Sequence, residues 1–500
     1  MPGLRKIIQE FGYSRRKKMI FEHEKVSLSE IGKLKHFTSA EITTGDSGFS
    51  IGFECLDREM FDPEKCYDLL SASGMKWARC QTGWNRCETV KGIYDFAWLD
   101  SIVDQLLSHH VQPWFNVGYG NKLYMSGLYS NAAVGFVPLY FGEETLQAWK
   151  NYVRALARHF KGRVDRFEIW NESNISNFWQ PKGSDPEDYA RLIKLTADEI
   201  RTEIPDAKIG ACTSGGPSCI ADGYVIKLFR SGILEDMNFF CVHSYCIQPE
   251  LNYRKTLSLL RRTLDSLGGK HVELYQGEGG YASWFPEGHW LPPYVHASER
   301  NQQIWMLRRY FLDFSIGLKM SSYFQMADMK GNYKVADETR KRPARCGILN
   351  GENYTPKPSY YTMKNLTAFF RDGMKTADLY FGSRLEEALP RSERHSRLID
   401  IGIQTNTFVR GRNPFFEYHL AEDMQYGFPG IAPIFFRAEM HPDLEPIRNP
   451  VLIDMLSGKI YRICSWSSDK FGALYIFDKL PLTDYPLVVC DETAIAITTA

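Results

Sequence analysis

Two glutamates stand at the ends of short apolar runs, and their positions suggest chemistry more strongly than any others in the chain. Glu172 closes a run that begins at Arg166, and Glu278 closes a run that begins at His271. Carboxyl groups at the carboxyl ends of barrel strands lie where barrel enzymes place their reactive residues. Two such carboxyls facing one cavity could cleave a glycosidic bond. Each could instead be structural, for example a strand-end glutamate paired with an arginine.

The residues around Glu172 fit an acid at the mouth of a barrel. Alternation along the strand predicts that Glu168, Trp170 and Glu172 point to one side, and that both Asn171 and Glu172 reach the mouth where the strand ends. An acid that protonates a leaving oxygen must hold its proton near neutral pH, and apolar neighbours such as Trp170 favour the neutral form. The Asn171 amide could hydrogen-bond a sugar hydroxyl next to the reacting carbon.

Glycines flank Glu278 on both sides, at 277 and 279. Because glycine has no side chain, backbone and substrate can approach each other closely there. Glu273 competes for the same role, but it lies nearer the middle of the predicted strand, where it would be buried or would face the helices. We therefore favour Glu278.

Eight short apolar runs, each followed by an amphipathic stretch, must position these side chains. The runs are largely unbroken by charge, as expected of parallel strands covered on both faces. Eight consecutive units predict an α/β fold, a (β/α)8 TIM barrel, over residues 46–373. The predicted strands are Gly48–Cys55, Lys76–Thr82, Gln112–Val117, Arg166–Asn171, Ala207–Cys212, Phe239–Ser244, His271–Gln276 and Met320–Met326. The predicted helices are Pro63–Ser73, Phe96–His109, Glu143–Phe160, Pro186–Ile204, Gly223–Ser231, Tyr253–Leu267, Glu299–Ile316 and Ser359–Arg371.

The sequence changes character after Gly373, where short β-prone stretches alternate with turn residues. This pattern predicts an accessory antiparallel β-sandwich over residues 374–500. Residues 1–45 precede the barrel and are expected to join this accessory domain. The predicted strands are Leu398–Val409, Phe415–Leu420, Ile434–Ala438, Val451–Asp454, Ile460–Cys464, Ala473–Phe477 and Leu487–Val489.

Composition narrows the expected partners and location. The chain has 60 basic and 60 acidic residues and a formal net charge of zero, so no affinity for nucleic acid or for a membrane surface is expected. Eleven cysteines without a CxxC pair, and an N-terminus that lacks a secretory pattern, predict a reducing, cytoplasmic setting. No metal or cofactor motif is present, so neither is expected. Self-association is left open.

The segment around Glu172 resembles a known family. Trp-Asn-Glu-Ser-Asn at 170–174 is similar to the Trp-Asn-Glu-Pro-Asn signature of clan A glycoside hydrolases, with Ser173 where the clan often has proline. The longer stretch 149–172 resembles glycoside hydrolase family 39, the β-xylosidase and α-L-iduronidase family. Residues 449–459 and 480–486 resemble the accessory sandwich of such enzymes.

The resemblance implies specific roles. Family members use a retaining mechanism, which would make Glu172 the acid/base on the fourth strand and Glu278 the nucleophile on the seventh. Clan members often carry a His and a Tyr after the sixth strand, where His243 could orient Glu278 or bind a hydroxyl and Tyr245 could hydrogen-bond the nucleophile. Arg79 on the second strand could hold Glu278 ionised, because a nearby cation lowers the pKa of a carboxyl. Arg79 could instead form a structural ion pair, and His243 could be a histidine whose hydrogen bonds are satisfied at the barrel mouth.

Other residues near strand ends could contact sugar, with core packing as the alternative for each: Asn116, Tyr119, Trp84, Trp179, Trp284, Gln325 and Asp328. The function expected from all these features is a retaining glycosidase for β-linked glycosides, with a β-xyloside favoured and a carbohydrate as the partner. The alternatives are a non-catalytic carbohydrate-binding protein on the same scaffold and a transglycosylase, which would use the same residues.

Overall fold

The computed structural model describes residues 28–128, 132–215, 220, 222–285, 297–330, 344–385, 402–421 and 432–499. The chain forms two compact units, one comprising His36–Gly373 and the other combining Met1–Lys35 with Met374–Ala500. The first unit begins earlier than the predicted residue 46, because Ser39 hydrogen-bonds the backbone of Ser71 and Met75.

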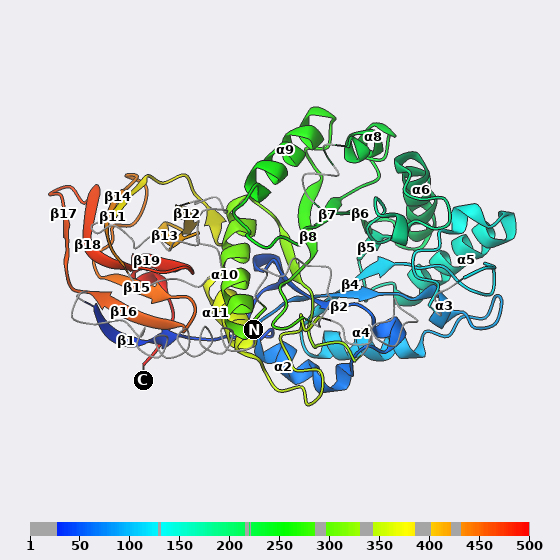
Figure 1. Ribbon diagram of the computed structural model, residues 1–500, viewed down its shortest axis with the longest axis horizontal. Helices are drawn as coiled ribbons and strands as arrows, with labels where there is room; N and C mark the ends of the chain where they lie inside the picture. The colour runs from blue at the N-terminus through cyan, green and yellow to red at the C-terminus, as the bar shows by residue number, and fades with distance from the viewer. Residues whose placement is uncertain are drawn as a thin grey trace, which may run out of the picture. The chain divides into compact units, whose positions relative to one another are not determined.

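Eight parallel strands of the first unit close into a barrel, which confirms the predicted fold. Figure 1 shows α9, α8, α6 and α5 following one another around the outside of the barrel strands. The strands are β2 (Phe49–Phe53), β3 (Trp77–Gln81), β4 (Gln112–Val117), β5 (Arg166–Ile169), β6 (Lys208–Ser214), β7 (Phe239–His243), β8 (Glu273–Gly279) and β9 (Met320–Tyr323).

A layer of large side chains fills the barrel interior. It includes Trp77, Cys241 and Tyr275, which are buried together in one cluster. Side chains two residues apart on a strand face the same way, so Arg79 and His243 lie one layer further toward the carboxyl ends of β3 and β7. The apolar layer thus forms a floor beneath a layer of charged side chains.

The barrel helices follow from amphipathic patterns and clear end signals. The α6 helix begins at Pro186, and the Asp185 carboxylate accepts hydrogen bonds from the backbone N–H groups of Glu187 and Asp188. The helices are α2 (Tyr67–Ala72), α3 (Trp84–Cys87), α4 (Ala97–Ser108), α5 (Glu143–Phe160), α6 (Pro186–Glu203), α8 (Tyr224–Arg230), α9 (Tyr253–Ser266), α10 (Glu299–Ser315) and α11 (Pro358–Phe369). Short 3-10 turns are η1 (Thr44–Asp46), η2 (Leu56–Arg58), η3 (Pro63–Lys65), η4 (Pro138–Tyr140), η5 (Ser176–Phe178) and, in the second unit, η8 (Glu492–Ala494).

The second unit contains two antiparallel sheets with a shared apolar core that includes Phe416, Phe436 and Phe477. The larger sheet has the order β10-β12-β13-β19-β15-β16-β1-β20 and the smaller has the order β11-β14-β18-β17. Its strands are β1 (Leu28–Leu34), β10 (Lys375–Thr376), β11 (Phe381–Leu385), β12 (Ile403–Arg410), β13 (Asn413–Leu420), β14 (Ala432–Glu439), β15 (Pro450–Asp454), β16 (Lys459–Ile463), β17 (Trp466–Ser468), β18 (Leu474–Leu482), β19 (Leu487–Asp491) and β20 (Ile497–Thr498). The start of the predicted strand Leu398–Val409 lies outside the described residues.

None of the described helices combines the length and the apolar character needed to cross a bilayer.

Candidate active site

A fully buried arginine, Arg79 on β3, organises the site. Its Nε donates to Glu168 Oε2 at 2.7 Å, and its Nη2 donates to Asn171 Oδ1 at 3.0 Å. Its Nη1 donates both to Glu54 Oε1 at 3.0 Å and to Glu278 Oε2 at 3.1 Å. One guanidinium therefore holds side chains that come from β5 and β8 and from the segments that follow β2 and β5.

Glu172 reaches the site because the chain leaves the barrel sheet early. The fourth barrel strand, β5, ends at Ile169, and both Trp170 (φ 66°) and Glu172 (φ 43°) adopt left-handed backbone conformations. Such conformations are unfavourable for residues with a side chain and need support from their surroundings. Asn116 Nδ2 donates to the Trp170 carbonyl at 2.7 Å, and the Trp170 indole N–H donates to the Phe178 carbonyl at 2.6 Å. These two hydrogen bonds stabilise the turn that places Glu172 at the site.

This turn corrects the predicted alternation. Glu168 points into the barrel toward Arg79, but Trp170 does not point the same way, because its ring packs against Trp149 of α5 and against Trp179. A strict period of two holds only while the residues are extended.

Glu278 lies in an irregular part of β8. The register between β8 and β9 shifts between Gln276 and Gly279, as in a β-bulge, a feature that can re-aim a side chain near an active site. The Tyr245 hydroxyl donates to Glu278 Oε1 at 2.6 Å, so each oxygen of this carboxylate has its own donor. A Cβ added to Gly277 would lie 2.9 Å from His243 Nε2, which explains why a residue without a side chain is needed beside the glutamate.

His243 lies among three carboxylates. It is 1% exposed, with Nδ1 at 3.4 Å from Glu172 Oε1 and 3.5 Å from Glu278 Oε2, and with Nε2 at 3.5 Å from Glu168 Oε1. Burial and the charge of Arg79 lower the pKa of His243, but the three carboxylates raise it by more, and the resulting pKa is about 9. The imidazole is therefore a cation near neutral pH and can donate toward both predicted reactive glutamates.

The two predicted reactive glutamates lie side by side. One carboxylate oxygen of Glu172 is within 4.8 Å of one of Glu278, and both are within the same distance of a His243 nitrogen. The Glu172 and Glu278 side chains are 10% and 15% exposed, so both are largely shielded from solvent. A group bound between them could exchange a proton with one carboxyl while the other attacks it.

Two sets of side chains have the spacing of metal ligands, Glu168–Cys212–His243 and Glu172–His243–Glu278. Both depend on a neutral nitrogen of His243, and the pKa of that ring is raised to about 9. A protonated imidazole has no free nitrogen to ligate a metal, and Arg79 already neutralises Glu168. A metal ion could bind at either set only by displacing the proton from His243.

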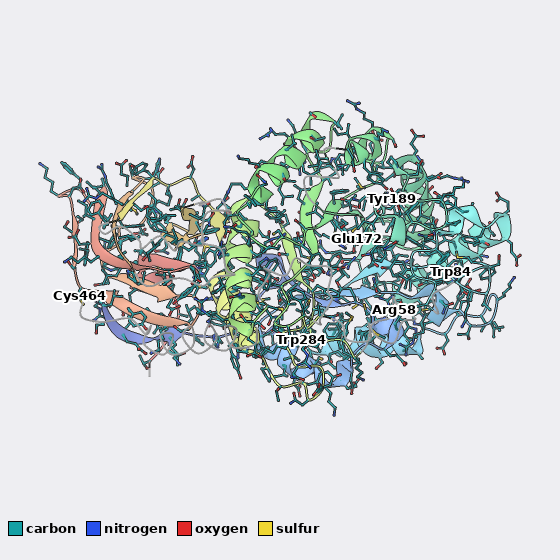
Figure 2. The ribbon with its side chains drawn as sticks, viewed as in Figure 1. Arg58, Trp84, Glu172, Tyr189, Trp284 and Cys464 are labelled. Atoms are coloured by element: carbon teal, nitrogen blue, oxygen red, sulfur yellow. The ribbon has the colours of Figure 1, made fainter. Side chains whose placement is uncertain are left out.

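Several predicted sugar contacts lie elsewhere. Asn116 is fully buried beneath Trp170, and Trp179 is fully buried with its indole N–H on the Tyr140 hydroxyl, so neither is placed to touch a substrate. Trp84, the first residue of α3, is also buried and stacks on Tyr152 of α5, and Figure 2 shows it away from Glu172. Trp179 packs against Trp170, and the Trp170 carbonyl accepts a hydrogen bond from Asn116, so both side chains support the turn after β5.

The other predicted sugar-contacting residues are either exposed or hydrogen-bonded to polar neighbours. Trp284 is 38% exposed, with the Arg345 guanidinium 5.3 Å from its ring centroid, so one side chain of the predicted set remains available for stacking. Gln325 is buried, and Asp328 is paired with Lys357 at 2.7 Å. Tyr119 is buried, and its hydroxyl accepts a hydrogen bond from Gln81.

Sequence reasoning missed two members of the site, Glu54 and Glu168. Glu54 lies at the end of the first predicted strand, which is the same signal that identified Glu172. For Glu168, the alternation predicted only which side of the strand it faces. The signal that could have found it is that a buried carboxyl within an apolar strand needs a charged partner, which Arg79 supplies. The prediction that Glu273 is buried or faces the helices near the middle of its strand is wrong, because β8 begins at this residue. Glu273 is exposed there and accepts a hydrogen bond from the Tyr275 hydroxyl.

The structure thus brings two carboxyls, one following the fourth barrel strand and one on the seventh, together at the carboxyl ends of the strands, where barrel enzymes place their reactive residues. The family model for glycosyl hydrolases family 39 matches residues 71–259, a range that includes Glu172 and His243. The resemblance of the chain to this family is thus confirmed.

Known proteins support the same family. A beta-xylosidase of Geobacillus stearothermophilus is 28% identical over 142 residues, which is 27% of this chain and 27% of that protein. A beta-xylosidase of Caldicellulosiruptor saccharolyticus is 23% identical over 163 residues, or 30% of this chain and 31% of that protein. The chain therefore matches about a quarter to a third of the length of these relatives.

Solved structures share the fold over nearly the whole chain. The GH39 enzyme from Xanthomonas axonopodis pv. citri has a TM-score of 0.57 at 13% identity, covering 94% of this chain and 99% of the other. A GH39 beta-xylosidase from Caulobacter crescentus has a TM-score of 0.53 at 14% identity, covering 92% and 99%.

Proposed function

We propose that this protein is a retaining glycoside hydrolase that acts on β-linked glycosides by double displacement. The observation that carries the proposal is the approach of the Glu172 and Glu278 carboxylate oxygens to within 4.8 Å. Retaining enzymes place their two carboxyl groups about 5–5.5 Å apart, whereas inverting enzymes leave about 6.5–9.5 Å to accommodate a water molecule. The short distance favours direct attack by one carboxylate on the sugar.

In the first step, Glu278 attacks the anomeric carbon and forms an ester, while Glu172 gives its proton to the departing glycosidic oxygen. In the second step, Glu172 takes a proton from water, the water oxygen attacks the anomeric carbon, and the bond to Glu278 breaks. Donors on both oxygens of Glu278, from Arg79 and Tyr245, orient the carboxylate for attack and stabilise it as it leaves.

A β-xyloside is the favoured substrate, because the two relatives named above are beta-xylosidases. Trp284 is an exposed aromatic side chain in the segment after β8, and we propose that it stacks on a sugar ring. We also propose a cytoplasmic location, which rests on the sequence features given above.

A panel of nitrophenyl glycosides, with the configuration of the first-formed sugar followed by NMR, tests this proposal. We expect hydrolysis of a β-glycoside with retention, no turnover by Glu278→Ala, and normal turnover by Glu273→Gln, a control on the same strand. Glu172→Ala should spare substrates with good leaving groups far more than those with poor ones. Equal losses on both kinds of substrate, or an inverted product, would contradict the assigned roles.

The same experiment separates two other functions. A non-catalytic carbohydrate-binding protein would bind glycosides without releasing nitrophenol, and its binding would survive Glu278→Ala. A transglycosylase would release nitrophenol but transfer the sugar to a second sugar rather than to water. Full occupancy of the acid, nucleophile and amide positions by Glu172, Glu278 and Asn171 favours hydrolysis over simple binding.

A further inference from the structure

Glu54 shares a donor with the proposed nucleophile. It follows β2 and is 1% exposed, and its Oε1 accepts from the same Arg79 Nη1 that donates to Glu278 Oε2. Its second oxygen, Oε2, has no hydrogen-bond partner among the described residues. A buried carboxylate with one oxygen unpaired is costly, and a neutral carboxylic acid in the same place costs less because it buries no charge.

The local sequence holds Glu54 in this position. Its carboxyl folds back over Gly52, where an added Cβ would lie 1.9 Å from Glu54 Oε2. The glycine therefore makes room for the carboxyl beside β2. Glu54 is thus placed by the backbone as well as by Arg79.

The charges of the site lead to the same protonation state. Two cations and four carboxyls of the described residues meet around the reaction centre, five of them buried and Glu278 largely so: Arg79, His243, Glu54, Glu168, Glu172 and Glu278. Under the proposed function, the acid is protonated and the nucleophile is ionised in the resting enzyme. Burial raises the pKa of Glu168, but Arg79 and His243 lower it to about 2, so that carboxyl is ionised. Two cations then balance two anions only if the remaining carboxyl is neutral, and an uncompensated buried charge is strongly unfavourable.

We propose that Glu54 is a positioning residue that carries a proton in the resting enzyme, so that it fixes Arg79 without competing as an anion for the donor shared with Glu278. The proposal rests on the assigned role of Glu278. It explains why Nη1 can serve two carboxyls at nearly equal distances, because one of them is a neutral acceptor and the other is the anion.

The surroundings of Glu54 support this assignment. Burial raises its pKa, Arg79 lowers it and the charge of Glu278 raises it, giving about 7 overall. The other titratable neighbours are the thiols of Cys55 and Cys80, and burial raises the pKa of both, so neither carries charge near neutral pH. Arg79 is the cation that faces Glu54, and Glu278 is the anion.

Three substitutions at this position test the proposal at about pH 6. Glu54→Ala removes an acceptor of Arg79 and should lower kcat by about tenfold or more. Glu54→Gln should restore most of this loss, because an amide oxygen accepts from Nη1 as a protonated acid does. Glu54→Asp keeps the acid but is too short to reach Nη1, and should not restore it. Failure of Gln with rescue by Asp would show that a charge is required, and would overturn the proposal.

A second measurement does not depend on activity. For a carboxyl whose folded pKa is raised from 4.5 to about 7, the stabilisation is complete below about pH 4.5 and is lost as the pH rises through 7. The unfolding midpoint of the wild type should therefore fall relative to that of Glu54→Gln across this range. A constant difference would overturn the proposal even if no glycoside is hydrolysed, and a changing difference would support it even if the assigned function fails.

Discussion

Replacing Tyr245 by phenylalanine should slow the second half of the proposed reaction more than the first. The Tyr245 hydroxyl donates to Glu278 Oε1 at 2.6 Å, a bond that is strong when Glu278 is a free carboxylate and weaker when it is an ester. Release of the sugar regenerates the carboxylate, so the hydrogen bond strengthens along that step. Formation of the ester consumes the carboxylate, so the bond weakens along that step and assists it only by orienting the carboxylate.

The size of the effect follows from the exposure of the tyrosine. A hydrogen bond to a charged group contributes about 1.5–3 kcal/mol, and Tyr245 is 44% exposed, which favours the lower value. Since 1.36 kcal/mol corresponds to a factor of ten in rate, hydrolysis of the ester should slow by about tenfold. For a substrate with a good leaving group, kcat and KM should fall together while kcat/KM changes little.

Rapid mixing with a dinitrophenyl glycoside provides the assay. We expect a burst of released phenol close to the enzyme concentration, and mass spectrometry should find the sugar attached to the peptide that contains Glu278. Tyr361→Phe, which removes a hydroxyl from a tyrosine 54% exposed on α11, is the matched control and should behave as the wild type. A parallel fall of kcat and kcat/KM, without a burst, would refute the reasoning.

Three further predictions concern stability. Arg79→Met should lower the free energy of unfolding in urea by about 3–5 kcal/mol, because it leaves Glu168 buried without its cation. Adding Glu168→Gln should recover part of this loss. A loss below about 1 kcal/mol would argue against the network. The pKa of His243 is raised from 6.5 to about 9, so the protonated ring stabilises the folded protein fully below about pH 6.5, and this stabilisation is lost as the pH rises through 9. The difference in unfolding free energy between the wild type and His243→Asn should therefore narrow between these two pH values. A difference that does not change with pH would contradict this. Asp185→Ala should cost about 1 kcal/mol by removing the cap of α6, whereas Asp185→Asn should keep most of the stability; equal losses by thermal unfolding would exclude capping.

Much of the fold could be predicted because its signals are local. The bounds of β4 (Gln112–Val117) and α5 (Glu143–Phe160) coincide with the predicted ones. The first follows from an apolar run that stops at a glycine, and the second from a long amphipathic pattern that Gly162 ends at a positive φ. In both elements, the residues that set the ends lie next to them in the sequence.

The turn after β5 could not be predicted in the same way. Its left-handed residues are stabilised by Asn116 from β4 and by the carbonyl of Phe178, neither of which is adjacent in sequence. Asn116 and Trp179 look like binding residues in the sequence because amides and indoles serve both roles. Their partners decide the matter, and these are the Trp170 carbonyl after β5 and the Tyr140 hydroxyl in η4.

The different protonation states of the carboxyls could not be predicted from the sequence either. Glu54, Glu172 and Glu278 all follow apolar runs, and no residue type or spacing separates an ionised carboxyl from a protonated one. Burial raises the pKa of both Glu168 and Glu54, and Arg79 lowers both. His243 lowers the pKa of Glu168 further, to about 2, whereas the charge of Glu278 helps to keep that of Glu54 at about 7. The sites of these groups follow from the barrel, and their protonation states follow from burial and from the charges that each one faces. Any change that redirects Arg79 should therefore alter several protonation states at once.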